Sequence, residues 1–247
     1  MNVSIEIAVA CSMFQRRLCW MLSSILQQKG DVPRLIFNVA YPANEGNPTT
    51  ESVCSFFRKE GLNVVEVVFS SRNEFQQRGL IRNKQLEKVN ADWVLFADAD
   101  MVYDPLFFED IGEKVMTVLK DEEKCISSRR TRLPVDHCCL QFNEKDSREY
   151  PCVVNDVASL VNGWPREKKP LSKNCGAGYF QLIHVEKLRA RFGNTYIDPK
   201  NARDQTLVHL TPSDERFRRM LGGVVGIDAK PQYHLNHERC QEVARQW

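Results

Sequence analysis

Three carboxylates follow an apolar run in the segment WVLFADADMVYD. Residues Trp93 to Ala97 have the composition of a buried strand, whereas Asp98, Asp100 and Asp104 are acidic. Because charged groups are costly to remove from water, they need a cation, hydrogen-bond donors or solvent at the end of such a strand. Carboxylates at this spacing favour Mn²⁺ or Mg²⁺ completed by phosphate oxygens and water. An exposed acidic turn is the alternative that so short a motif leaves open.

A second acidic position opens the segment SDERFRRML, in which Asp214 and Glu215 precede apolar residues at helical spacing. Acidic residues in a first helical turn interact favourably with the helix dipole, which is the simplest explanation for them. A carboxylate at the edge of a pocket also accepts a proton from a hydroxyl group, as a general base does. Asp214 is therefore a candidate base, and Asp204 is a weaker one.

Two histidines, His234 and His237, lie close together in the segment HLNH near the end of an expected strand. Histidines are often ordinary core or surface residues, and this alternative stays open. As a metal ligand, a neutral imidazole adds a nitrogen to an oxygen-rich site and favours Mn²⁺ over Mg²⁺.

Two further groups are candidates for contact with a phosphorylated ligand. Gly176 and Gly178 lie in NCGAGYF, and a glycine-rich turn permits close approach of the backbone to a ligand. Arg78 and Arg82 precede the aspartates, and arginine suits bidentate contact with a diphosphate. Ordinary charge on a helix surface explains the arginines equally well.

The positions of these residues depend on an alternation of strand-like and helix-like segments. This alternation predicts an α/β fold with a mostly parallel central sheet flanked by helices. Strands are expected at Ser4–Ala10, Arg34–Pro42, Asn63–Ser70 and Trp93–Ala97. Helices are expected at Arg16–Gly30, at Gly79–Ala91, and in a segment capped by Thr49 or Thr50 that ends at Gly61. The aspartates then lie at the carboxyl edge of the sheet, where ligands bind in open α/β folds.

The second half of the chain has weaker periodicity. A helix is expected to open with Pro105, and residues 125–174 are expected to be loops with little regular structure. Order is expected to return with a strand in GAGYFQLIH, helices in VEKLRARFG and DERFRRMLGG, and a strand near QYHLNH. The length of 247 residues suits a single domain.

Composition restricts the classes of partner. A net charge of +2 and a pI near 8.0 do not indicate nucleic-acid binding. No window approaches the roughly 20 apolar residues of a membrane span, and the first residues indicate a strand more than a secretory signal. We therefore expect a cytoplasmic protein without a transmembrane segment. Basic runs such as REKK (Arg166 to Lys169) allow peripheral contact with a membrane.

The nine cysteines include no CxxC pair. Cys11, Cys19 and Cys54 lie in apolar segments and are expected to be reduced core thiols. A further group has spacings that match no common zinc pattern, and it comprises Cys125, His137, Cys138, Cys139 and Cys152.

Taken in order, four segments resemble the nucleotide-sugar glycosyltransferases of family 2 and their galactosyl- and N-acetylgalactosaminyl-transferring relatives, which have the Rossmann-like GT-A fold. The segments are LIRNKQLEKVNADWVLFADADMVYDP, GAGYFQLIH, SDERFRRMLGG and YHLNHER. Together they span most of the chain from Leu80 to Arg239.

The resemblance implies one GT-A domain over residues 1–247, with a nucleotide-binding half at 1–104 and an acceptor- and sugar-binding half at 105–247. It implies a UDP-sugar donor and an inverting transfer to a glycan, lipid-linked or other hydroxyl acceptor. Mn²⁺ would be held by Asp98, Asp100 and a tail histidine, His234 before His237, and Asp214 would be the base. Asp98 would alternatively reach the ribose or the water shell of the metal.

Two departures from the family leave the nucleotide base open. The usual N-terminal proline-threonine-tyrosine-asparagine run is replaced by ACSMF, and an acid that commonly follows the second strand is missing from FNVAYP. Asn38 and Asn44 are the only nearby polar substitutes. We further expect residues 125–174 to close over the donor, and Trp164 to line the sugar and acceptor pocket.

Two other functions remain open from the sequence. A sugar nucleotidyltransferase would share the nucleotide domain and the acidic metal site, but ACSMFQRR contains no glycine for a phosphate-binding loop. A non-catalytic module that binds carbohydrate or nucleotide would keep the fold and the ligand without turnover.

Overall fold

The computed structural model describes residues 1–12, 14–43, 49–71, 74–76, 78–128, 130–132, 151–155, 157, 167–168, 180–196 and 213–235. Within this part the main sheet has seven strands in the order β10-β6-β9-β4-β1-β2-β3. Its strands are β1 (Ser4–Ala10), β2 (Arg34–Pro42), β3 (Val64–Phe69), β4 (Trp93–Asp98), β6 (Cys125–Ser128), β9 (Phe180–His184) and β10 (Val224–Ile227). β9 is antiparallel to β4 and β6, and the other pairs are parallel. The predicted mostly parallel sheet is therefore confirmed.

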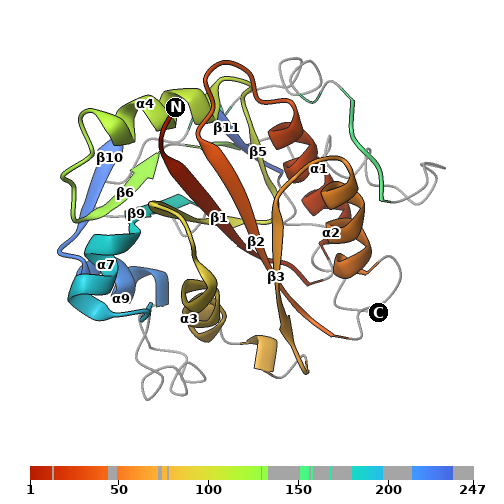
Figure 1. Cartoon of the computed structure of the whole chain (residues 1–247), viewed down its shortest axis with the longest axis horizontal. Helices are drawn as coiled ribbons and strands as arrows, with labels where there is room; N and C mark the ends of the chain where they lie inside the picture. Colours follow the sequence, from red (N-terminus) through yellow and green to blue (C-terminus); the bar gives the residue numbers. More distant parts are fainter. Residues whose placement is uncertain are drawn as a thin grey trace.

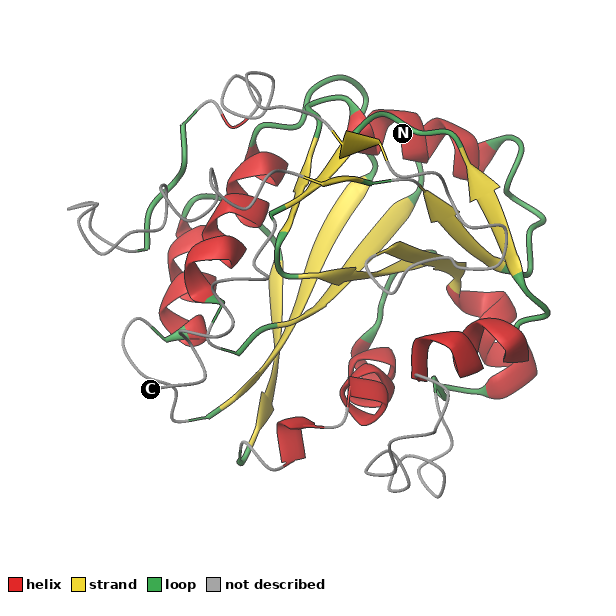
Figure 2. Ribbon diagram, turned by 180° about the vertical axis from the view of Figure 1, so that it is seen from behind, coloured by secondary structure: helices red, strands yellow, loops and turns green. Residues whose placement is uncertain are grey.

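Helices cover both faces of this sheet (Figures 1 and 2). One face packs against α1 (Gln15–Leu26), α2 (Thr50–Lys59) and α4 (Phe107–Met116). The other face packs against α3 (Arg78–Lys88), α7 (Val185–Phe192) and α9 (Ser213–Met220). A short 3-10 turn, η1 (Glu74–Gln76), leads into α3. Among the described residues no helix has the length and apolar character needed to cross a membrane.

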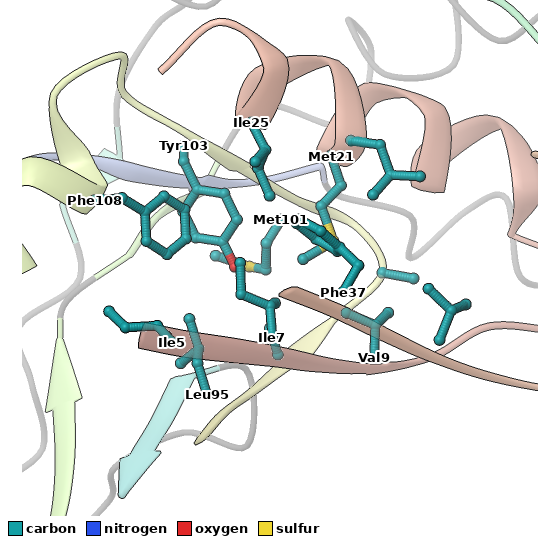
Figure 3. Packing of buried hydrophobic residues seen from close by; sticks show 14 of the residues in the cluster. Ile5, Ile7, Val9, Met21, Ile25, Phe37, Leu95, Met101, Tyr103 and Phe108 are labelled. Atoms are coloured by element: carbon teal, nitrogen blue, oxygen red, sulfur yellow. The ribbon is translucent and has the colours of Figure 1, made fainter. Parts of the chain in front are cut away.

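The core between β1 and α1 follows from the two-residue period of a strand, which sends alternate side chains to opposite faces. Ile5, Ile7 and Val9 lie on one face of β1 and are completely buried. Figure 3 shows Met101 and Tyr103 between this face and the residues Met21 and Ile25 of α1. Burial of apolar area, at roughly 25 cal/mol per Å², holds this layer together.

A second, smaller sheet follows the aspartates. Its order is β5-β11-β7-β8, formed by β5 (Met101–Tyr103), β11 (Gln232–His234), β7 (Thr131–Arg132) and β8 (Glu167–Lys168). β11 runs antiparallel to β5, with His234 opposite Met101 and Gln232 opposite Tyr103. Val102, Tyr233 and Leu235 pack with Trp20 of α1 in a separate hydrophobic cluster. This packing fixes the tail of the described chain beside the aspartate turn.

Several elements agree with the sequence and others correct it. β1 and β2 have the expected bounds, and Thr49 caps α2 by accepting a hydrogen bond from the Ser52 amide at 3.0 Å. The expectation of little regular structure after Cys125 is wrong at β6, a strand of only four residues that lies between β10 and β9 in the main sheet. Neither β5 nor β10 was expected. These short strands lack a periodic pattern, and their pairing comes from segments remote in sequence.

The three cysteines expected in the core, Cys11, Cys19 and Cys54, are free thiols and are fully buried. Of the residues weighed for zinc, Cys125 is buried in β6 and Cys152 is half-buried. His137, Cys138 and Cys139 lie outside the described residues.

Helix α3 is attached to the sheet by buried polar groups. Asn38 Nδ2 donates to Glu6 Oε1 at 2.7 Å, and the Asn90 amide donates to Glu6 Oε2 at 2.9 Å. Gln85 Nε2, on α3, donates to the carbonyl oxygens of Val9 at 3.0 Å and Asn38 at 2.8 Å. Hydrogen bonds are stronger inside a protein than in water, so the two bonds donated by Gln85 hold α3 in place against β1 and β2.

The buried Glu6 carboxyl should make folding depend on pH. Burial raises the pKa of Glu6 above its ordinary value of 4.5, against opposing hydrogen bonds from Asn90 and Asn38. The folded protein then holds this proton more tightly than the unfolded chain. The stabilising effect is complete below pH 4.5 and is lost as pH rises through the folded-state pKa.

Glu6→Gln removes this titration. The unfolding free energy of the wild type minus that of Glu6→Gln should therefore fall as pH increases, in urea denaturation between about pH 4 and about pH 8. A difference that is constant with pH would show that Glu6 has equal proton affinity in both states.

Candidate functional site

The two aspartates of the DAD motif lie at the carboxyl edge of the parallel strands. β4 ends at Asp98, which is opposite Ala10, the last residue of β1. Asp100 follows in the turn before β5 and is only 5% exposed. Side chains at this edge of an open α/β sheet are placed for ligand binding.

The structure brings His234 next to Asp100. The distance from His234 Nε2 to Asp100 Oδ2 is 3.4 Å, and both side chains are largely buried. The backbone enforces this proximity, because the Leu235 amide donates to the Asp100 carbonyl oxygen at 2.9 Å. Two segments that are remote in sequence therefore contribute an oxygen and a nitrogen to the same point.

This pair fits a divalent ion by its chemistry and its spacing. Two ligands at right angles, each about 2.1 Å from an ion, lie roughly 3 Å apart. One carboxylate oxygen and one imidazole nitrogen suit Mn²⁺. In the described part of the chain, no group of three or more His, Cys, Asp or Glu side chains is gathered for a metal. An ion here would therefore need further ligands from a bound diphosphate, water or residues outside the described ranges.

Asp98 has a different neighbour. Its Oδ1 lies 3.8 Å from Nη2 of Arg78, the first residue of α3. The Arg78 side chain is 54% exposed and that of Asp98 is 27% exposed. Exposed ion pairs of this kind contribute at most about 1 kcal/mol, so Arg78 can exchange this contact for a phosphate at little cost.

Arg82, one helical turn further along α3, lies in a different environment. It is 4% exposed, and its Nη1 donates to Gln181 Oε1 at 2.9 Å and to the Tyr196 hydroxyl. The sequence predicted that both arginines face a diphosphate. The partners described for Arg82 belong to the fold.

Asp104, the third carboxylate, turns the chain into α4. Its Oδ1 accepts a hydrogen bond from the Leu106 amide at 2.9 Å, and its carbonyl oxygen accepts one from Phe107 at 2.9 Å. Its own amide donates to the Pro231 carbonyl oxygen at 3.0 Å. These contacts explain why α4 begins at Phe107, two residues after the expected Pro105.

Asp214 is the second residue of α9, and its side chain is not among those described. The neighbouring Glu215 forms an ion pair with Arg219 one turn later. Gly176, Gly178 and His237 lie outside the described residues, as do Trp164 and Asp204.

Asn38, weighed as a polar substitute near the nucleotide base, is completely buried and donates to Glu6. Its side chain therefore contributes to the attachment of α3 and is not exposed at the sheet edge. Asn44 lies outside the described residues. Gln181 and Tyr196 were not singled out, because no local pattern marks them and their contacts connect distant elements.

Asp104→Ala should test whether the third carboxylate is structural. Loss of the hydrogen bond to Leu106 should cost about 1 kcal/mol of folding stability, as does loss of a typical intramolecular hydrogen bond. Chemical denaturation measures this loss, and nucleotide binding measured in parallel should stay unchanged. A large loss of nucleotide affinity with intact stability would place Asp104 in the binding site.

Comparison with known proteins gives structural neighbours only. No protein-family model matches the chain, and no curated protein matches it in sequence. Three solved structures illustrate the match. S. aureus TarS 1-349 has 14% identity and a TM-score of 0.59, over 100% of this chain and 64% of that one. The TarS 1-349 complex with UDP-GlcNAc has 12% identity and a TM-score of 0.56, over 94% and 58%. The mannosyltransferase PcManGT from Pyrobaculum calidifontis, in complex with GDP-Man and Mn²⁺, has 11% identity and a TM-score of 0.62, over 99% and 60%.

The chain thus spans less than two thirds of the length of each of these structures. At such identities the likeness concerns the fold. The chain has the α/β fold with a mostly parallel central sheet expected from its sequence, of the Rossmann-like GT-A type, and shares it with these three structures.

Proposed function

We propose that this chain is a sugar-nucleotide glycosyltransferase of the family 2 type, which moves a hexose from a UDP-sugar to a hydroxyl group of a glycan or a lipid-linked acceptor. The observation that carries the proposal is the meeting of Asp100 and His234 at the carboxyl edge of the central sheet. The fold adds support, because structures that share it are complexes with UDP-GlcNAc and with GDP-Man and Mn²⁺.

Asp100 and His234 would hold the divalent ion, with His237 as a further candidate. When bound, the ion would neutralise negative charge on the departing diphosphate. The limited exposure of both side chains supports this role, because a buried carboxylate beside an imidazole is held in place for a shared ligand. Mn²⁺ suits this mixed oxygen and nitrogen set better than Mg²⁺.

Asp98 and Arg78 would bind the nucleotide part of the donor. Arg78 stands at the first turn of α3, beside Asp98, and its guanidinium is exposed enough to meet a phosphate. Asp98 would then accept a hydrogen bond from the ribose or from water on the ion. The glycine turn with Gly176 and Gly178, together with Trp164, would line the pocket for the sugar and the acceptor.

Asp214 would act on the acceptor. It would remove the proton of the acceptor hydroxyl as the oxygen attacks the anomeric carbon opposite the diphosphate, which inverts that carbon. The position of α9 supports this role. The ring centroid of Phe217, one turn after Asp214, lies 6.2 Å from that of Phe96. Phe96 precedes Asp98 by two residues on β4.

Asp100→Ala and His234→Ala should each weaken Mn²⁺-dependent binding of UDP at least about tenfold, or about 1.4 kcal/mol. The reason is the loss of one of the two side-chain ligands that Asp100 and His234 would supply to the ion. Isothermal titration with and without Mn²⁺ measures the effect, and Asp104→Ala is the matched acidic control. Unchanged Mn²⁺ dependence in both variants would remove this pair from the metal site.

Asp214→Asn should leave the affinity for UDP unchanged and lower turnover by about two to four orders of magnitude, as loss of a general base does. Release of UDP from UDP-GlcNAc in Mn²⁺, with water taking the sugar in place of the acceptor hydroxyl, measures turnover, with GDP release from GDP-mannose alongside. Glu215→Gln is the control in the same helical turn. Nucleotide binding by the wild type without any release would instead identify a non-catalytic binding module.

A further inference from the structure

Tyr196, which follows α7, joins four elements of the fold. Its hydroxyl donates to Gln181 Oε1 on β9 at 2.8 Å, and its amide donates to Asn83 Oδ1 on α3 at 2.6 Å. Its ring stacks on Phe217 of α9, with centroids 3.9 Å apart and planes inclined by 24°. The same ring meets the Phe96 ring on β4 edge-on at 5.0 Å.

The Arg82 guanidinium completes this cluster from α3. Besides its hydrogen bonds to Gln181 and the Tyr196 hydroxyl, it lies 5.0 Å from the Phe96 ring centroid and 4.8 Å from that of Tyr196. Cation–π contacts sheltered from water are stronger than the same contacts at exposed sites. Arg82 is therefore held by two hydrogen bonds and two aromatic faces at 4% exposure.

The spacing of the two arginines on α3 separates their environments. Residues four apart lie on the same face of a helix, about 6 Å apart along its axis. Arg78 stands at the exposed first turn beside Asp98, and Arg82 lies one turn deeper, within the aromatic cluster. Of the two arginines, only Arg78 is exposed enough to contact a ligand.

The cluster lies next to both proposed reaction groups. Phe96 and Asp98 are two residues apart on β4 and so share one face of the strand. Backbone position 214 lies one turn before Phe217 on α9. A displacement of Tyr196 would therefore move α9 relative to the edge that carries Asp98.

We propose that Arg82, Gln181 and Tyr196 are positioning residues, which set the place of α9, and with it Asp214, relative to the aspartate edge. This inference rests on the proposed function, because α9 carries the residue assigned there as the base. It gives Arg82 a task distinct from phosphate binding, which falls to Arg78.

Tyr196→Phe is the most selective test, because it keeps the stacked ring and removes only the hydroxyl. The expected result is a fall in kcat of about tenfold or more for release of UDP from UDP-GlcNAc, or of GDP from GDP-mannose, in Mn²⁺. KM for the donor should change less than about twofold, since uniform binding is unaffected. Arg82→Met should behave in the same way, whereas a phosphate ligand would show its loss mainly in donor KM.

Ser4→Ala is the control for a purely structural effect. Ser4 Oγ donates to Asp92 Oδ2 at 2.7 Å and accepts from the Asp92 amide at 3.0 Å. Both residues lie at the amino ends of β1 and β4, away from the aspartate edge. This variant also loses two hydrogen bonds, and its kcat should stay at the parent value. An equal fall in kcat in Ser4→Ala would show that general destabilisation explains Tyr196→Phe, and the positioning role would be rejected.

Two further measurements separate this inference from the proposed function. In an Asp214→Asn background, Tyr196→Phe should have no additional effect on kcat, because the group that it positions is gone. Full additivity would reject the link to Asp214. Hydrogen exchange of residues 213–221 should rise in Tyr196→Phe and stay unchanged in Ser4→Ala, whether or not either donor is turned over. Unchanged exchange in α9 would overturn the positioning role, and absence of turnover in the wild type with both donors would reject only the proposed function.

Discussion

The candidate site depends on one short antiparallel pairing, that of β5 with β11. Backbone hydrogen bonds in this ladder set which residue of the tail stands opposite the aspartate turn, and the Leu235 amide extends the ladder to the Asp100 carbonyl. A shift of one residue would send His234 to the other face of the small sheet, away from Asp100. The apolar packing of Val102 and Tyr233 with Trp20 of α1 opposes such a shift. Apolar packing on one face therefore fixes polar geometry on the other.

Helix α3, which carries Arg78, is held against the sheet by polar contacts. Gln85 of α3 donates to the Asn38 carbonyl oxygen, and Asn38 donates to Glu6. One turn earlier in α3, Arg82 donates to Gln181 of β9. Unsatisfied buried groups are expensive, so such an attachment tolerates few alternative positions of the helix. Hydrophobic contact alone would allow α3 more freedom to slide. Because these contacts hold α3 in place, its first residue, Arg78, has a defined position beside Asp98 at the sheet edge.

The sequence predicted the first half of the fold because its signals are local. The bounds of β1 and β2 follow from continuous apolar runs, and residue type limited the cap of α2 to Thr49 or Thr50, of which the structure has Thr49. β5, β6 and β10 escaped prediction because four or fewer residues carry no period, and their partners lie far away in sequence.

In the site, the aspartates were placed from the strand that precedes them. The approach of His234 was expected only through the family resemblance, since no local rule joins residues so distant. The environment of Arg82 was missed because Gln181 and Tyr196 come from other elements. The chemical roles of Asp98, Asp100, Asp214 and the histidines stay predictions.

The pairing of β5 with β11 also has a consequence for folding during synthesis. β5 is synthesised soon after β4, whereas its partner β11 follows more than a hundred residues later. At the usual pace of translation the nascent chain waits on the order of ten seconds before that partner exists. Throughout this interval Val102 lacks Tyr233 and Leu235, its partners in the hydrophobic cluster beside α1. The pair of Asp100 and His234 therefore forms only after the segment that carries β11 has been synthesised.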